Sequence, residues 1–146
     1  MSADVKYDVE EGCDDGAPDI VHVELGLSGD RVVPAEVTAA VGVLPSRAWS
    51  KGECYESKAG GTRKRPLGIW VVTCDGSDVQ QCALELLAVA EPRAAAIRGM
   101  ADAAGATISV GIWWEPAGGQ GGFTLSSDVM RRISELCDRV DVYSPG

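Results

Sequence analysis

The stretch DIVHVELGLSG, residues 19–29, alternates apolar and polar side chains at every second position. The apolar side chains are those of Val21, Val23, Leu25 and Leu27. The positions between them are His22, Glu24 and Gly26. A period of two is the pattern of a strand with one buried face. We therefore predict a strand here, whose other face meets water or a second layer.

The segments that follow this strand predict a helix, a loop and a second strand. VVPAEVTAAVGV (residues 32–43) is typical of a short helix, with Pro34 in its first turn and Gly42 as its C-terminal cap. Residues 45–66 are rich in glycine, proline and charge, which predicts a loop with little secondary structure. LGIWVVTC (residues 67–74) is apolar throughout, which predicts a central strand covered on both faces.

The second half of the chain predicts three helices and two strands. Ser77 and Gln80 have the spacing of a capping box, and a stripe of apolar residues then runs to Ala90. Pro92 interrupts the helix, which resumes over residues 93–105 and stops at Gly105. Residues 106–115 predict a strand, residues 126–137 a third helix and residues 139–144 a short closing strand.

These elements predict one α+β domain over residues 20–146, with a mixed, mostly antiparallel sheet and helices packed on it. Residues 1–19 predict a flexible acidic arm. GDRVVPAEVTAAVGVL (residues 29–44) and GGFTLSSDVMRRISEL (residues 121–136) share their order of glycine, apolar pair, acid, valine and helix. They suggest an internal strand-helix pseudo-repeat.

The composition favours a cytoplasmic protein. The chain has 146 residues, enough for one domain with a core of its own. No apolar run approaches the roughly 20 residues that span a bilayer, and the acidic first residues do not resemble a signal peptide. The five cysteines are odd in number and none forms a C-x-x-C pair. We expect buried, reduced thiols rather than a disulfide framework or a zinc site.

The charge is unevenly distributed. Residues 1–19 hold seven acidic residues against one lysine, a net charge of −6, and residues 45–66 hold six basic residues against two acidic ones, a net charge of +4. The simple alternative is that both charges serve solubility. The functional interpretation is that they steer a protein partner with a basic surface. The net charge of −9 argues against general nucleic-acid binding.

The stretch PSRAWSKGE (residues 45–53) places a tryptophan in the charged loop. Trp49 either folds back as a structural plug or serves as an aromatic anchor among basic residues, since Trp and Arg are enriched at interface hot spots. We expect Trp70 and Trp114 in the core, and Trp113 on the opposite side of its strand, where it caps a sheet face or lines a groove. The candidate binding residues are Arg47, Trp49, Lys51, Glu53, Arg63, Lys64, Arg65, Trp70 and Trp113.

The sequence contains no recognisable catalytic or metal motif. His22 is the single histidine, and no cysteine stands at a spacing that marks a thiol dyad with it. It also has no second histidine or carboxylate at ligand spacing, so we assign no catalytic residue, metal or cofactor. GGQGG (residues 118–122) lacks the lysine and serine of a phosphate-binding loop and predicts a turn.

The order of these segments resembles the bacterial family known as domain of unknown function 4279, over residues 20–143. The specific positions are Pro45, Trp49, Lys51, Gly52, Glu53, Trp70, Phe123, Leu125, Asp141 and Tyr143. The resemblance implies a compact α+β domain in a bacterial cytoplasm. It implies no activity, because the family has none assigned.

We therefore expect a non-enzymatic protein-binding module, immunity- or antitoxin-like, that uses its acidic arm to find a basic partner. The alternative is a small-molecule binder or enzyme, with a pocket between Trp49, Trp70, Trp113 and the basic loop. Lys51 and Arg65 would suit an anionic ligand there. A third hypothesis is a self-associating structural subunit without a different partner.

Overall fold

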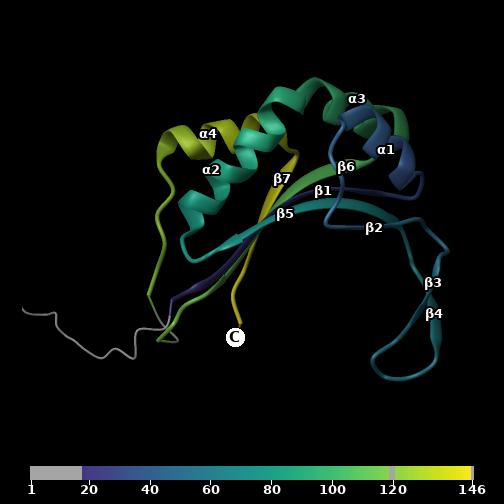
Figure 1. The fold of residues 1–146 in the computed structure, drawn as a ribbon, viewed down its shortest axis with the longest axis horizontal. Helices are drawn as coiled ribbons and strands as arrows, with labels where there is room; N and C mark the ends of the chain where they lie inside the picture. The colour runs from purple at the N-terminus through teal and green to yellow at the C-terminus, as the bar shows by residue number, and fades with distance from the viewer. Residues whose placement is uncertain (1–17, 119–120, 146) are drawn as a thin grey trace, which may run out of the picture.

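Five strands form one mixed sheet in the order β2-β5-β1-β6-β7, as the computed structural model shows (Figure 1). The structure describes residues 18–118 and 121–145. All neighbouring strands are antiparallel except β6 and β7, which run parallel. The strands of this sheet are β1 (Ile20–Gly29), β2 (Arg47–Trp49), β5 (Gly68–Gly76), β6 (Thr107–Glu115) and β7 (Arg139–Tyr143).

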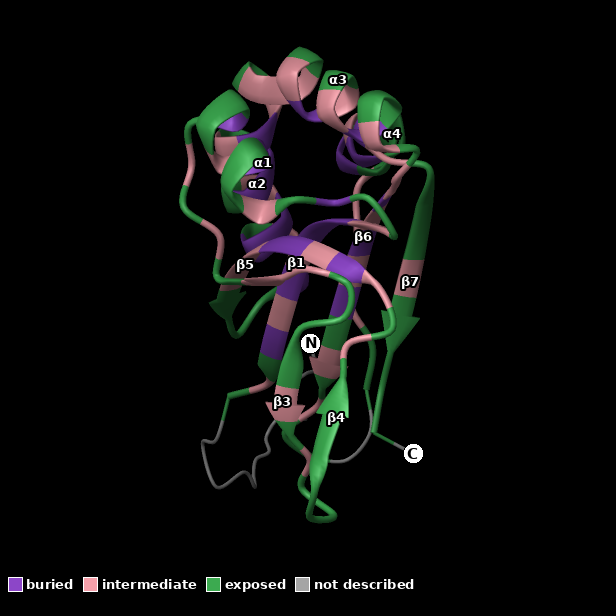
Figure 2. Cartoon of the chain, turned by 90° about the vertical axis from the view of Figure 1, so that its right-hand side faces the viewer, coloured by how far each residue is buried: buried purple, intermediate pink, exposed green. Residues whose placement is uncertain are grey.

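The helices cover one face of this sheet. Figure 1 shows all of them above it, and Figure 2 shows buried residues concentrated between the two layers. The helices are α1 (Pro34–Val41), α2 (Val79–Ala90), a 3₁₀ turn (Glu91–Arg93), α3 (Ala94–Ala104) and α4 (Ser127–Leu136). The prediction of a single α+β domain is confirmed.

β1 is the centre of the sheet, and its alternation is confirmed. The side chains of Val21, Val23, Leu25 and Leu27 are at most 1% exposed, and they pack under α2. The apolar stripe of α2 is likewise buried against β1 and β5. Asp78, rather than Ser77, caps this helix, because its carboxylate accepts a hydrogen bond from the Gln81 amide at 2.9 Å.

The loop predicted over residues 45–66 contains three short strands. β2 adds to the edge of the sheet beside β5, and β3 (Cys54–Glu56) pairs with β4 (Thr62–Lys64) in a separate hairpin. The five glycines and prolines of the segment concealed these pairings, but positive backbone φ angles at Gly60 and Gly61 allow the turn that makes the hairpin. The hairpin projects beyond the sheet at one end (Figure 1).

The prediction that residues 67–74 form a strand covered on both faces is wrong for the second face. Trp70 and Val72 lie under the helices, as their pairing with Leu27 and Leu25 requires. On the other face, Val71 is only 5% exposed although no described helix covers it. Its neighbour in β2 is Arg47, whose side chain extends over the sheet and takes the place of a second layer.

The N-terminal end of β1 lies at the end of the sheet opposite the hairpin. The predicted flexible arm lies outside the described residues up to position 17. Asp19 is bound to the domain: one carboxylate oxygen accepts from the Ala117 amide at 2.9 Å, the other from the Trp114 indole at 3.1 Å. These two hydrogen bonds lower the pKa of Asp19.

The two similar segments each place a helix, α1 or α4, after a strand of the central β1–β6 pair. The strands that next pair with β1 and β6 differ in direction. After α4, β7 runs parallel to β6, whereas the strand that pairs with β1 after α1 is β5, which runs antiparallel to it. Of the described cysteines, Cys82 is buried as predicted, but Cys54 is exposed in β3.

Candidate functional site

The face of the sheet opposite the helices, which we call the open face, carries two rows of functional side chains. Paired residues on neighbouring strands point to the same face. The first row runs across four strands as Asp75, His22, Trp113 and Tyr143. The second row, two residues further along, is Thr73, Glu24, Gly111 and Asp141.

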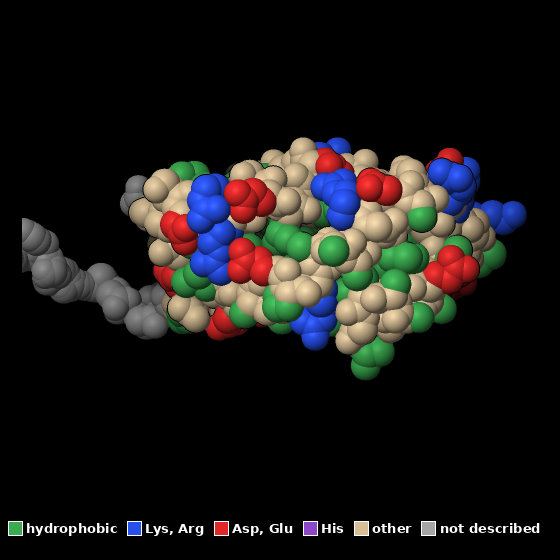
Figure 3. Space-filling model, turned by 90° about the horizontal axis from the view of Figure 1, so that it is seen from above, with side chains coloured by type: hydrophobic (Ala, Val, Ile, Leu, Met, Phe, Trp, Pro, Cys, Tyr) green, Lys and Arg blue, Asp and Glu red, His purple; other side chains and the backbone are tan. Residues whose placement is uncertain are grey.

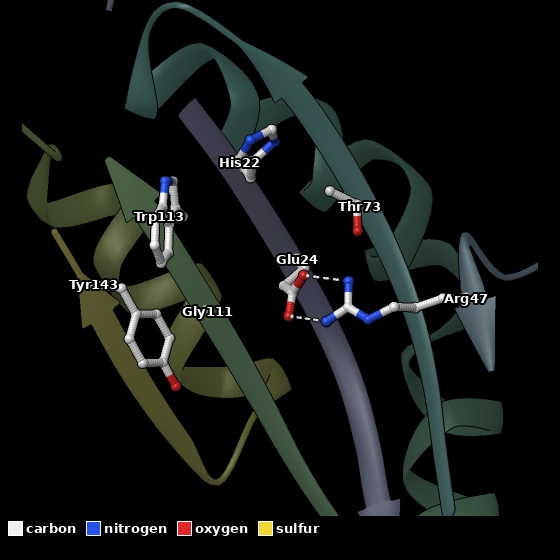
Figure 4. Close-up of a pocket in the computed structure, with 7 residues that line it drawn as sticks. All are labelled: His22, Glu24, Arg47, Thr73, Gly111, Trp113 and Tyr143. Carbon is white, nitrogen blue, oxygen red and sulfur yellow. Dashed lines mark hydrogen bonds and ion pairs between the residues drawn. The ribbon is translucent and has the colours of Figure 1, made fainter. Parts of the chain in front are cut away.

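A groove of about 480 Å³ lies over these rows. Its volume is within the range of ligand-binding pockets. Figure 4 shows Trp113 and Tyr143 on one side, Arg47 on the other and Glu24 between them on the floor. The residues that line it are His22, Glu24, Arg47, Thr73, Gly111, Trp113 and Tyr143.

An ion pair forms the floor of the groove. The guanidinium of Arg47 donates two parallel hydrogen bonds to the Glu24 carboxylate, at 2.9 and 3.1 Å. Arg47 reaches Glu24 from the edge strand β2 across β5, so this bidentate pair joins the edge of the sheet to its centre.

A second polar pair lies at the end of the groove away from the hairpin. His22 Nδ1 is 2.6 Å from Asp75 Oδ1, and the His22 side chain is 44% exposed and that of Asp75 67%. In the part of the chain that the structure describes, no thiol accompanies this histidine on the open face, and Cys74 pairs with Val23 and points toward the helices. Burial also raises the pKa of the Cys74 thiol, which disfavours a reactive thiolate. The described residues therefore form no thiol–histidine dyad at this site.

Two aromatic rings form the apolar wall. The Trp113 and Tyr143 rings are 6.3 Å apart between centroids and tilted by 31°. Trp113 is 40% exposed and Tyr143 is 50% exposed, which makes them large apolar groups that the fold leaves in contact with water. An exposed aromatic pair beside a groove marks a place where another molecule can pack.

Thr73 contributes a hydroxyl that has no hydrogen-bond partner among the described residues, although its oxygen is buried. Its amide is satisfied by the Ser46 hydroxyl at 2.9 Å. A buried polar atom without a partner costs free energy of folding, and such atoms concentrate at functional sites.

The residues predicted for binding are divided between three places. Arg47 and Trp113 line the groove, as described above. Trp70 is buried on the helical side, where its indole donates to the Thr38 hydroxyl at 3.0 Å. The sheet separates Trp70 from Trp113, so the predicted pocket between Trp49, Trp70 and Trp113 is not formed.

The remaining predicted residues belong to the hairpin and its base. The Arg65 guanidinium lies 3.6 Å from the Trp49 ring centroid and 3.7 Å from that of Tyr55. Lys51 pairs with Asp30 at 3.2 Å, and Glu53 accepts a hydrogen bond from the Ser50 amide at 3.0 Å. Arg63 and Lys64 are exposed on β4.

Sequence reasoning missed Glu24, Thr73, Gly111, Asp75 and Tyr143 as members of one site. The alternation in each strand already places them opposite the apolar positions. The order of the strands, which brings them side by side, has no local signal in the sequence. Asp75 and Tyr143 are 68 residues apart in number but stand in one row.

The fold and the site define a two-layer α+β domain with one open sheet face and a groove upon it. The chain belongs to the family described as Domain of unknown function (DUF4279), whose model matches residues 19–143. No curated protein and no solved structure matches the chain. Among the described residues, no cluster of side chains could hold a metal ion, and none of the described helices is long and apolar enough to cross a membrane.

Proposed function

We propose that this domain is a non-enzymatic module that binds a partner protein with a basic surface. The contact surface is the end of the open face remote from the hairpin, where Trp113 and Tyr143 are exposed. The observation that carries the proposal is the position of this aromatic pair. Asp75 stands in the same row on the far side of His22, and Glu115 follows Trp113 by two residues on β6, at the end of the sheet to which the acidic residues 1–19 are joined.

Charge and apolar area are combined at this end. Asp75 and Glu115 are exposed, and the 19 residues that lead into β1 carry a net charge of −6. Acidic groups around an aromatic centre favour fast encounter with a basic surface, while buried aromatic rings supply most of the binding energy. The aromatic centre and the acidic rim support this division of roles.

The helical face offers less to a charged partner. Two of its arginines are paired within the domain: Arg132 with Glu91 at 2.6 Å, Arg131 with Asp128 at 2.7 Å. Figure 3 shows positive and negative side chains adjacent to each other on this face. The hydrogen bond and charge of Arg132 lower the pKa of Glu91, as expected for a formed pair. Charges that are already paired contribute little to steering.

The same features support, as part of this proposal, an immunity- or antitoxin-like role in a bacterial cytoplasm. A small acidic module suits the neutralisation of a basic toxin by covering its surface. The competing hypothesis of an anionic small-molecule ligand finds less support, because Lys51 and Arg47 are each paired with a carboxylate and Arg65 is stacked between two rings.

The experiment that tests the proposal first identifies the partner by photo-crosslinking from position 115 in cells, and then measures association with the purified partner at several salt concentrations. Three proteins are compared: the full chain, a variant with Asp75→Asn and Glu115→Gln, and a control with Arg63→Gln and Lys64→Gln on the hairpin. We expect slower association and a smaller salt dependence for the first variant only.

Deletion of residues 1–17 should slow association further. The proposal is wrong if this deletion and the Asp75/Glu115 variant both leave the association rate and its salt dependence unchanged. It is also wrong if Trp113→Ala, in a protein of unchanged stability, leaves the dissociation rate unchanged.

A further inference from the structure

We propose that the groove holds one cationic side chain of the partner, an arginine guanidinium seated over Gly111. This inference rests on the proposed function, since it names the group that a basic partner would insert. It concerns the interior of the groove, whereas the proposed function depends on the aromatic pair and the acidic rim around it.

Gly111 leaves a space that is surrounded by suitable groups. A carbon atom placed where its side chain would begin lies 3.8 Å from Glu24 Oε1 and 3.8 Å from the Tyr143 ring. A group at this position therefore touches a carboxylate oxygen and an aromatic ring at once. Carboxylates and ring faces are the two surfaces that attract a guanidinium.

A second carboxylate lies on the other side of the same space. The register places Gly111 between Glu24 on β1 and Asp141 on β7. Each of these carboxylates has one arginine partner, Arg47 at 2.9 Å and Arg139 at 3.1 Å. A carboxylate has about four lone-pair positions, so both can accept further hydrogen bonds.

The balance of charge favours a cation over an anion. The two rows hold the carboxylates of Asp75, Glu24 and Asp141, and the arginines that reach them are Arg47 and Arg139. Apart from His22, which is charged only when protonated, three negative groups face two positive ones. An incoming anion would meet carboxylates on both sides of Gly111.

The protein already holds one guanidinium against aromatic rings. Arg65 is stacked between the rings of Trp49 and Tyr55 at 3.6 and 3.7 Å. Trp113 and Tyr143 present a second aromatic pair, with a carboxylate below it and no arginine of the described residues stacked upon it. The groove thus offers exposed aromatic rings, the kind of group that contacts an arginine elsewhere in the domain.

The direct test titrates the protein with ethylguanidinium, n-butylammonium and acetate, each at the same ionic strength. Binding is followed by the NMR shifts of the Gly111 amide and the Trp113 indole N–H. We expect saturable shifts with ethylguanidinium at millimolar concentration, weaker ones with n-butylammonium and none with acetate. Saturable shifts with acetate, or none with either cation, would overturn the proposal.

Two variants on β6 distinguish an effect of the groove from an effect of the neighbouring sheet surface. Gly111→Val fills the space without changing charge, and a valine suits a strand position where the added atom meets ordinary contacts of 3.4 Å or more. Ser109→Val is the control, because it adds an apolar group to the same face outside the groove. We expect ethylguanidinium affinity to fall about tenfold or more in the first variant only.

Partner binding distinguishes this inference from the proposed function. We expect Gly111→Val to raise the dissociation rate of the partner about tenfold and to leave the association rate unchanged. If it changes neither rate while the Asp75 and Glu115 variant slows association, the partner binds the open face without filling the groove, and only the present inference fails. If neither variant has an effect and the deletion of residues 1–17 also leaves association unchanged, both proposals fail.

Discussion

The guanidinium of Arg65 lies 3.6 Å from the centre of the Trp49 ring, and this contact joins the projecting hairpin to the edge of the sheet. The Tyr55 ring completes the stack at 3.7 Å. The backbone supports the same junction, since the Gly52 amide donates to the Arg65 carbonyl at 2.8 Å and the Arg65 amide to the Glu53 carbonyl at 2.8 Å. A tryptophan in a charged loop is thus explained by an arginine of that loop.

We predict that Arg65→Gln loosens the hairpin without unfolding the sheet. Loss of two cation–π contacts at a partly exposed site should cost about 1 kcal/mol. Hydrogen exchange at the Gly52 amide should become faster, because its acceptor is held by the stack. Amides in the centre of β1 should exchange as before.

Two further substitutions control this measurement. Arg65→Lys keeps the charge but not the planar group, and we expect only partial recovery of protection at Gly52. Arg63→Gln removes a neighbouring exposed charge and should leave the exchange rate unchanged. Equal acceleration in the Arg63 and Arg65 variants would show that charge alone, rather than stacking, holds the hairpin.

Thr73→Val should stabilise the protein. The Thr73 hydroxyl oxygen is buried without a partner among the described residues, and valine has nearly the same shape. Removal of such an unsatisfied hydroxyl should raise the free energy of unfolding by about 1 kcal/mol. Urea denaturation measures this change as a higher midpoint at an unchanged slope.

Thr73→Ser tests the cause of that effect. It keeps the hydroxyl and removes a methyl group, so we expect it to be less stable than the parent protein. A Thr73→Val protein that unfolds at lower urea than the parent would show that the hydroxyl is hydrogen-bonded in solution, contrary to our interpretation.

The sequence was sufficient for those parts of the fold that depend on local pattern. The alternation in β1 and the apolar stripe of α2 show which side of each segment faces the core, and Gly105 marks where a helix ends. The failures concern very short strands. β2 forms because a distant partner, Val71 for Arg47, satisfies its backbone groups, and the hairpin pairs Cys54 with Lys64, but a three-residue strand carries no periodicity of its own.

The candidate site was less accessible to the sequence than the fold. Arg47 and Trp113 were found because basic and aromatic residues are conspicuous. Glu24, Thr73 and Gly111 are ordinary residues on three different strands. They become a site only through the order β5-β1-β6, which is fixed by pairings across the whole chain.

Two glycines should respond in opposite ways to alanine. A side chain at Gly68 would begin 2.7 Å from the Val32 carbonyl oxygen, too close for any heavy atom, so the backbone must shift. We expect Gly68→Ala to lower the free energy of unfolding by roughly 1–3 kcal/mol. Thermal unfolding should show a lower midpoint.

Gly99→Ala is the matched control. Gly99 lies inside α3, and the space around its missing side chain is open. Alanine is the better helix former by about 0.5–1 kcal/mol, so this variant should unfold at a higher temperature than the parent. Destabilisation of both variants to the same extent would contradict the close packing of β5 against the residues after β1.

Asp138 should make the free energy of unfolding depend on pH in the acidic range. Its carboxylate accepts a hydrogen bond from the Ile108 amide at 2.8 Å and pairs with Arg98 at 3.0 Å, which lowers its pKa in the folded protein. A carboxyl group with a lowered folded pKa contributes stability above its ordinary pKa of about 4, and this stability is lost as pH falls through the folded value. The free energy of unfolding should therefore decrease from about pH 4 downward.

Asp138→Asn should remove part of that dependence. The difference in unfolding free energy between the parent and the variant should be largest near neutral pH and should shrink in acid, because a protonated Asp138 also lacks the charge that binds Arg98. Asp102 is the control, since it lies 3.9 Å from the same arginine and is 70% exposed, and an exposed pair of this kind contributes little. A difference that stays constant from neutral pH to pH about 2 would show that Asp138 acts through its shape and not through its charge.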